Sequence, residues 1–122
     1  MFNMFSVTFA VAGSLTADTL FNFIVPCDCT LRAVSAGADN ASTAVLNVGT
    51  HTDPDGYLDA KDFGDSNVPT LFDLDDFNGA LVTDQGNDYP HIAKDTNIEV
   101  GIDVDGSTDP DDACVVLWFQ QG

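Results

Sequence analysis

The feature of this sequence that most limits its fold is the alternation of apolar and polar residues in several short runs. Over residues 98–105, Ile and Val alternate with Glu, Gly and Asp, and residues 5–11 alternate in the same way. A period of two puts successive side chains on opposite faces of an extended strand. No segment shows a sustained helical period of 3.6 residues. The pattern therefore predicts an all-β protein.

The spacing of these runs predicts the architecture. Further strands are expected over residues 18–26, 29–37, 44–50, 79–84, 89–94 and 113–119, with a short strand or a single helical turn over 70–77. Turn residues rich in Gly, Asp and Pro separate the runs, and no interdomain linker is visible. We therefore expect one domain over residues 1–122, a β-sandwich or jelly-roll-like barrel of about eight short strands.

Two segments are candidates for contacts with another subunit. The run over 113–119 is apolar on both faces, so its strand is either covered on both sides or meets a partner with its outer face. Segment 1–12 is either an arm that contacts a neighbouring subunit or the first strand of the domain's own sheet. The candidate interface residues are Phe2, Met4, Phe5, Val116 and Trp118.

The charge of the chain excludes several classes of partner. Twenty acidic residues, all but one of them aspartates, face three basic residues, so the net charge is −17. Such a chain repels both nucleic acids and anionic membranes. It also has no apolar run long enough to span a bilayer and no basic region of a signal peptide, so cytoplasmic synthesis is expected. The bias towards aspartate resembles proteins of salt-rich environments, although aspartate is also frequent in β-turns.

A calcium site is conceivable in the segment "HTDPDGYLDAKD", residues 51–62. When Gly56 is aligned with the invariant glycine of an EF-type loop, four aspartates occupy side-chain ligand positions. They are Asp53, Asp55, Asp59 and Asp62. The match fails at the first ligand position, where His51 stands, at the last, which lacks the usual glutamate, and in the absence of flanking helices. The alternative is an ordinary surface loop.

A second acidic loop, "DVDGSTDPDDA", joins the last two predicted strands. It holds five aspartates over residues 103–112, and clustered carboxylates are the ligands that Ca²⁺ prefers. It does not fit the EF-hand spacing. The simpler interpretation is a solvated hairpin loop, because Asp and Gly favour such turns for backbone reasons.

The sequence gives little support for catalysis. It contains no phosphate-binding loop, dinucleotide fingerprint or nucleophile elbow, and only two histidines, His51 and His91. Cys27, Cys29 and Cys114 lack the spacing of a common zinc site and are expected to act as small apolar residues. We therefore expect a protein without enzymatic activity and without an obligatory cofactor, calcium being the one candidate.

Two segments resemble small auxiliary virion proteins of tailed viruses, the capsid decoration or cement proteins. They are "FIVPCDCTLRAVSAGADNASTAVLNVGT", residues 23–50, and "HIAKDTNIEVGIDVDGSTDPDDACVVLWFQQG", residues 91–122. Together they cover about half the chain by strand spacing. One departure is Asp95, where the resemblance leads us to expect a glycine in the turn before the penultimate strand.

This resemblance implies a function without chemistry. Proteins of this type bind the outside of an assembled capsid, commonly as trimers, and clamp neighbouring major capsid subunits. The expected partner is therefore the major capsid protein, the expected location is the virion surface, and the aspartate bias would imply a virus of a halophilic host, such as an archaeon. The alternative is a calcium-dependent carbohydrate- or receptor-binding module of a viral tail or spike, with Trp118 or Tyr57 stacking on sugar. A small jelly-roll enzyme is a third hypothesis.

The charge of the chain predicts a strong dependence of stability on salt. Self-repulsion among the acidic residues destabilises the compact state, and salt screens it, since the Debye length falls from about 30 Å at 0.01 M to about 3 Å at 1 M. We expect the melting temperature to rise when NaCl is increased from 0.01 M to 1 M, measured by circular dichroism. An unchanged melting temperature would contradict the halophilic interpretation.

Overall fold

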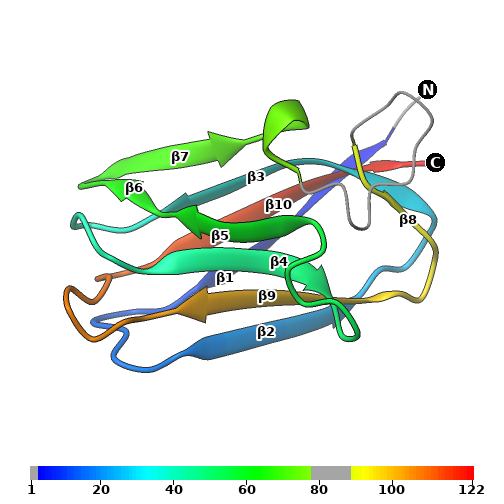
Figure 1. Cartoon of the computed structure of the whole chain (residues 1–122). Helices are drawn as coiled ribbons and strands as arrows, with labels where there is room; N and C mark the ends of the chain where they lie inside the picture. Colours follow the sequence, from blue (N-terminus) through cyan, green and yellow to red (C-terminus); the bar gives the residue numbers. More distant parts are fainter. Residues whose placement is uncertain (1–2, 78–88) are drawn as a thin grey trace.

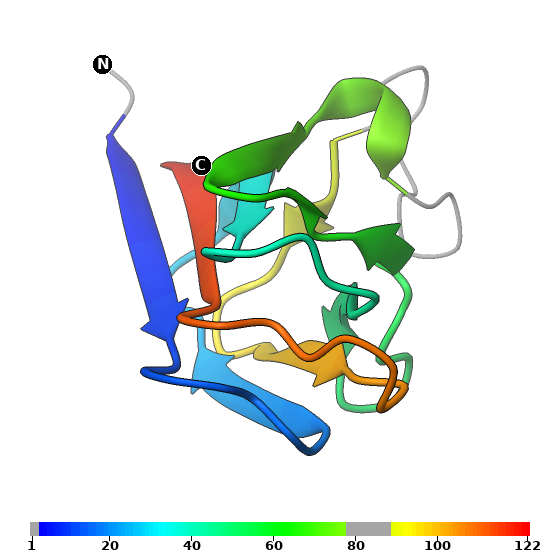
Figure 2. The ribbon, with the colours of Figure 1, turned by 90° about the vertical axis from the view of Figure 1, so that its left-hand side faces the viewer.

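The computed structural model describes residues 3–77 and 89–122, and their strands form two antiparallel sheets (Figure 1). In the first sheet the order is β1 (Met4–Ala10), β10 (Cys114–Gln121), β3 (Cys29–Gly37), β7 (Val68–Phe72) and β6 (Gly64–Asp65), and β8 (His91–Ile92) also pairs with β3. In the second sheet the order is β2 (Thr19–Ile24), β9 (Asn97–Asp103), β4 (Val45–Thr50) and β5 (Leu58–Asp62). Figure 2 shows the sheets as two facing layers. The predicted β-sandwich is confirmed.

Most strands lie where alternation predicts them. The segment 70–77 contains both predicted alternatives, because the end of β7 is followed by a single 3-10 turn, η1 (Leu74–Asp76). In the described ranges no helix has the length and apolar character needed to cross a membrane. Strands β5 and β6 lie in a segment rich in Asp and Gly that was expected to be a loop, which explains why the described strands exceed the expected eight. The predicted strand over 79–84 lies outside the described residues.

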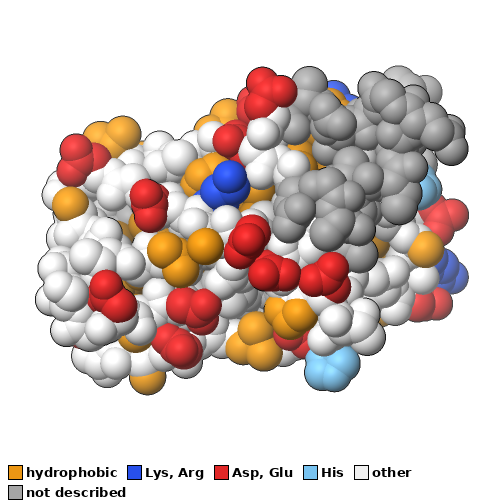
Figure 3. Space-filling model, in the orientation of Figure 1, with side chains coloured by type: hydrophobic (Ala, Val, Ile, Leu, Met, Phe, Trp, Pro, Cys, Tyr) orange, Lys and Arg blue, Asp and Glu red, His pale blue; other side chains and the backbone are white. Residues whose placement is uncertain are grey.

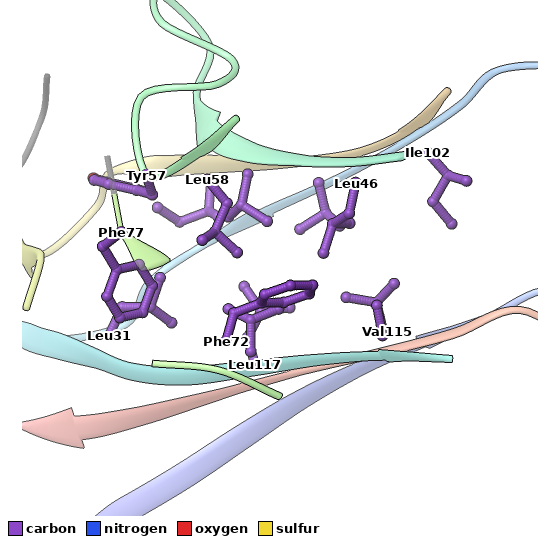
Figure 4. Close-up of a cluster of buried hydrophobic side chains, with 14 of the residues drawn as sticks. Leu31, Leu46, Tyr57, Leu58, Phe72, Phe77, Ile102, Val115 and Leu117 are labelled. Carbon is purple, nitrogen blue, oxygen red and sulfur yellow. The ribbon is translucent and has the colours of Figure 1, made fainter. Parts of the chain in front are cut away.

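The core lies between the two sheets. Leu31 of β3 and Leu117 of β10 point from the first sheet towards Leu46 and Leu58 of the second (Figure 4). All four side chains are completely buried. Burial of each such side chain stabilises the fold by about 1.5–3 kcal/mol. The alternation in the sequence therefore arises because each strand has one buried face and one outward face.

Stacked aromatic rings close the side of the sandwich where β1 and β2 meet. The ring of Phe5 stacks on Phe119 at 5.1 Å between centroids, and Phe9 stacks on Phe21 at 4.7 Å. Phe23 meets Phe119 edge-on at 5.8 Å. These contacts attach the inner face of β1 to both sheets, because Phe119 belongs to the first sheet and Phe21 and Phe23 to the second.

The N-terminal segment forms a strand of the domain's own sheet in this structure. From Met4 to Ala10 each residue of β1 has an antiparallel partner in β10. Among the described residues no strand pairs with the other side of β1, which is an edge of its sheet. Contact of segment 1–12 with a neighbouring subunit stays a prediction.

The turn over residues 50–56 packs directly onto Gly49 of β4. A Cβ atom at Gly49 would lie 2.6 Å from the backbone carbon of Pro54 and closer still to the carbonyl oxygen of Asp53. Three hydrogen bonds hold the turn in place: the N–H of Thr50 donates to the Asp53 oxygen, Asp53 N–H to Thr50, and Gly56 N–H to Asp53. The close approach therefore requires glycine at this position.

This packing predicts that alanine is not tolerated at Gly49 but is tolerated at the nearby Gly101. Gly49→Ala is expected to lower the free energy of unfolding by about 1–3 kcal/mol or more, because backbone atoms must move. Gly101→Ala on the adjacent strand β9 is the matched control, since its Cβ would make only ordinary contacts at 3.7 and 3.9 Å. Urea unfolding measures both variants. Equal stability of the two would contradict the packing described here.

Candidate functional site

The outer face of the first sheet is assembled from strands at both ends of the chain. Strand β10 lies between β1 and β3, and residues that face each other across an antiparallel pair point to the same side of the sheet. Trp118 lies opposite Ser6 on one side and Ala33 on the other, and Val116 lies opposite Thr8 and Ser35. Because Val115, Leu117 and Phe119 are buried, their neighbours Val116 and Trp118 point outwards.

This outer face contains no acidic residue, and we call it the acid-free face. Its members are Met4, Ser6, Thr8, Ala10, Thr30, Ala33, Ser35, Gly37, Leu71, Cys114, Val116, Trp118 and Gln120. One basic residue borders it: Arg32, at the bulge of β3, places its guanidinium carbon 3.9 Å from the ring centroid of Tyr89. In a chain with 20 acidic residues, a whole sheet face without one indicates a contact surface, because interface cores are depleted of charge.

The second sheet has the opposite character. Glu99 and Asp103 lie on the outer side of β9, and Figure 3 shows acidic side chains spread over this part of the molecule, above β4, β5 and β9. The Glu99 carboxylate is almost buried and lies 2.6 Å from Nδ1 of the exposed His51 ring, while Asn47 Nδ2 donates to Asp103 at 2.8 Å. Apart from Asp65 on β6, the acidic residues of the described strands therefore belong to this sheet, and the other acidic residues that the structure describes lie in loops and in η1.

One end of the acid-free face is hollowed. The hollow has a volume of about 330 Å³ and reaches from Ser35 and Val116 to Asp39 and Asp112 at its rim. The backbone N–H of Gly13 donates to Asp112 Oδ1 at 2.7 Å. This hydrogen bond lowers the pKa of Asp112, whereas hydrogen bonding to the Asp112 carboxyl raises the pKa of Asp39. The rim acids are thus tied to each other and to the backbone.

Three of the five predicted interface residues share the acid-free face. Met4 is 55% exposed, and Val116 and Trp118 are half-buried between neighbouring strands. Phe5 points into the sandwich and stacks on Phe119, so it does not contribute to this surface. Phe2 lies outside the described residues. Their role in subunit contacts stays a prediction, whereas the uncharged Ser and Thr residues beside them were missed, although the lack of Asp in these runs was a usable signal.

The four predicted calcium ligands are not gathered into one cluster. Asp53 and Asp55 lie in the turn over Gly49, while Asp59 and Asp62 lie on β5. Burial, and then the neighbouring Asp55 carboxyl, raise the pKa of Asp53. Among residues 3–77 and 89–122 no group of three or more His, Cys, Asp or Glu side chains is placed to hold a metal ion. Calcium binding stays a prediction.

The acidic closing loop is held by hydrogen bonds to neighbouring loops. Asp105 accepts from the hydroxyl of Thr43 and from the backbone N–H of Ser107. The main chains of Thr43 and Thr108 are bonded as well, at 3.0 Å. These contacts support the interpretation of the segment as a structured hairpin loop whose carboxylates accept backbone and hydroxyl hydrogen bonds.

The other candidate residues do not form a recognisable catalytic arrangement among the described residues. Cys27, Cys29 and Cys114 are free thiols, and burial raises the pKa of Cys29 to about 11, which suits a small core residue. A cavity of about 500 Å³ is lined by both histidines, but Tyr57 at its wall is only 4% exposed and packs in the core. Burial raises the pKa of Tyr57 to about 12. Its ring is not an exposed platform for a sugar.

Comparison with known proteins gives one structural likeness. No protein-family model matches the sequence, and no curated protein matches it. The fold is similar to that of a chain in the capsid asymmetric unit of cyanophage Pam1, with a TM-score of 0.59 and 14% sequence identity. The match covers 99% of this chain and 85% of the other. At this identity the likeness shows a shared fold.

The turn at Asp95 has a backbone conformation that fits the resemblance described in the sequence analysis. Asp95, which stands where a glycine was expected, adopts a left-handed backbone with φ of 70°. Its N–H donates to the carbonyl of Val25, and Thr96 N–H donates to Ala93. Because glycine most readily adopts this conformation, the turn has the geometry that the expected glycine would favour.

The hydrogen bonds of Asp105 predict part of the acid sensitivity of the fold. The Thr43 hydroxyl, and then the Ser107 N–H, lower the pKa of Asp105. A lowered pKa in the folded state stabilises the protein above the unfolded pKa, and this stabilisation is lost as the pH falls through the folded value. The melting-temperature difference between wild type and Asp105→Asn should therefore be largest near neutral pH and shrink below about pH 4.

The exposed residue Asp59 of β5 provides the control for this experiment, because Asp59→Asn removes one carboxylate from the surface of a strand and not from the closing loop. Thermal unfolding of the three proteins across the acid range gives the comparison. A difference between wild type and Asp105→Asn that grows on acidification would contradict the assigned hydrogen bonds.

Proposed function

We propose that this protein is a capsid decoration protein that binds the outside of an assembled viral capsid and stabilises it. It has no catalytic role and acts through contacts with the major capsid protein and with copies of itself. The observation that carries the proposal is the likeness, over nearly the whole chain, to a chain of a cyanophage capsid asymmetric unit. The resemblance of residues 23–50 and 91–122 to decoration proteins supports the same function.

The distribution of charge supports a protein that works by surface contact. Acidic side chains on the second sheet and in the loops keep free copies apart by repulsion. The acid-free face lets an uncharged surface approach another acidic protein without bringing carboxylates together. We propose that Val116 and Trp118 on this face join the subunits of a trimer, since a large aromatic side chain near the centre of a contact usually dominates its energy.

The host belongs to the same proposal. An excess of aspartate over lysine is favourable in concentrated salt, where the repulsion among 17 net negative charges is screened. A virus of a halophilic host is therefore the expected source. The salt titration described above bears directly on this part of the proposal.

Binding to capsids tests the proposal. Purified protein should co-sediment in stoichiometric amounts with capsids assembled from the major capsid protein of its virus. Trp118→Lys is expected to break the proposed trimer contact and thereby to weaken capsid binding roughly 30-fold or more, the effect of losing about 2 kcal/mol at a hot spot. Leu20→Lys is the matched control, because Leu20 is a 55% exposed apolar residue on the second sheet and should retain wild-type binding.

Two outcomes would count against the proposal. The first is the absence of wild-type binding to these capsids. The second is a melting temperature that falls on addition of EDTA, because a bound ion stabilises a folded protein by mass action and its removal reverses this. That result would favour the calcium-dependent binding module instead.

A further inference from the structure

The sandwich has edges of two kinds. On one side, β5 carries Asp59, Lys61 and Asp62, and the edge strand β6 has only two residues. Charges and very short strands are the features that normally prevent an edge from pairing with another chain. On the other side, the seven residues of β1 and the six of β2 contain no charged residue and no proline. Figure 2 shows β1 at the outer side of its sheet. This side is unprotected.

The hydrogen-bonding groups that β1 leaves free can be assigned. Val11 N–H donates to the carbonyl of Ala113, and Gln121 N–H donates to the carbonyl of Asn3. In an antiparallel strand the backbone groups of alternate residues turn to opposite sides. Residues with odd numbers from 3 to 11 therefore face β10. The outward groups are those of Met4, Ser6, Thr8 and Ala10.

The sequence of β1 is nearly symmetric about its centre. In "MFSVTFA" the order is apolar, Phe, hydroxyl, Val, hydroxyl, Phe, apolar, with Val7 in the middle. A contact between two identical chains across a two-fold axis requires a self-complementary surface, in which residue i meets residue j and j meets i. A strand with this symmetry meets that requirement when it pairs with its own copy.

We propose that the β1 strands of two copies pair antiparallel, with Val7 of each copy at the two-fold axis. Ser6 of one copy then lies opposite Thr8 of the other, and Phe5 opposite Phe9, which are favourable cross-strand pairs. The four outward residues of each strand form about eight main-chain hydrogen bonds in this register. The inner, apolar faces of both strands stay on the same side of the joined sheet.

Charge favours β1 over the other unprotected edge. Strand β2 is also symmetric, about Asn22, but its neighbour β9 carries Glu99 and Asp103 on the same outer face. Pairing of two β2 strands would extend one acidic face into another. Pairing of two β1 strands instead continues the acid-free face of one copy into that of the other, which is the arrangement that two chains of charge −17 tolerate.

The proposed contact does not depend on the capsid function. It uses the edge of the sheet, whereas the trimer contact proposed above uses the sheet's outer face, so the two do not compete for the same atoms. If the protein decorates a capsid, edge pairing would link two neighbouring copies, and only that consequence rests on the proposed function.

Disulfide cross-linking tests the register. In the proposed pair the two Val7 residues form a non-hydrogen-bonded pair with a Cα separation of about 4.5 Å, which suits a disulfide. Val7→Cys, oxidised in 1 M NaCl to screen repulsion, should give a non-reducing gel band at twice the 12.9 kDa chain mass. Ser6→Cys is the matched control, because position 6 faces position 8 of the other copy. Roughly tenfold more dimer is expected for Val7→Cys than for Ser6→Cys.

A second pair of variants shows whether the cross-link forms through paired β1 strands. The alternatives are random collision of two molecules and pairing through the β2 edge. Thr8→Pro removes an outward N–H without removing a hydrogen bond to β10, and should abolish the Val7→Cys dimer when the two are combined. Asn22→Pro, the equivalent change on β2, should leave it intact. Three results would each overturn the proposal. They are a Val7→Cys dimer band no stronger than that of wild type, a stronger band for Ser6→Cys than for Val7→Cys, and loss of the Val7→Cys dimer when Asn22→Pro is added. Capsid binding is measured separately and would be unaffected by that failure.

Discussion

Burial of alternate side chains between two antiparallel sheets is the constraint on which the other features of this structure depend. When Val115, Leu117 and Phe119 are held inside, Val116 and Trp118 must point outwards. A shift of one residue in register would exchange these two sets and expose the core. The buried face therefore determines which residues point outwards, and with it the contrast between the acidic outer side of the second sheet and the acid-free face of the first.

Several aspartates accept hydrogen bonds from the backbone of the loops. Asp105, Asp112 and Asp18 each accept a hydrogen bond from a loop N–H, at 2.9, 2.7 and 2.8 Å. Short carboxylate side chains are well suited to this work, because they reach nearby main-chain donors that no strand partner satisfies. The acidic composition thus supports the loops of the sandwich and, on the outside, keeps separate molecules apart.

Two adjacent surfaces, the acid-free face and the outer edge of β1, contain no acidic residue. Met4, Ser6 and Thr8 belong to both surfaces. Their side chains lie on the acid-free face, and their outward backbone groups form the open edge of β1. A chain with strong self-repulsion can approach another copy, or another acidic protein, most easily through such surfaces. A non-enzymatic protein that acts by contact, as proposed for a capsid component, needs no more than this.

Alternation in the sequence was sufficient to predict the strands, because it reflects a local property of the backbone. The strand β3 begins and ends at the expected residues, 29 and 37, and a sandwich was the expected architecture. Of the predicted interface residues, Met4, Val116 and Trp118 point outwards, whereas Phe5 points into the sandwich and stacks on Phe119; their role in subunit contacts stays a prediction. The strands β5 and β6 and the hydrogen bond of Asp105 to Thr43 were not predicted, since they depend on pairing between segments and not on a local pattern.

The sequence by itself determined the all-β class, the inward faces of the main strands and the large negative charge. Each of these follows from the local alternation of residues or from the composition. Only the tertiary structure decided that β10 lies between β1 and β3, that one sheet face is free of acids, and that β1 forms an open edge. The physical reason is that strand pairing joins residues as far apart as Met4 and Gln120 through hydrogen bonds between main chains, which are the same for every sequence.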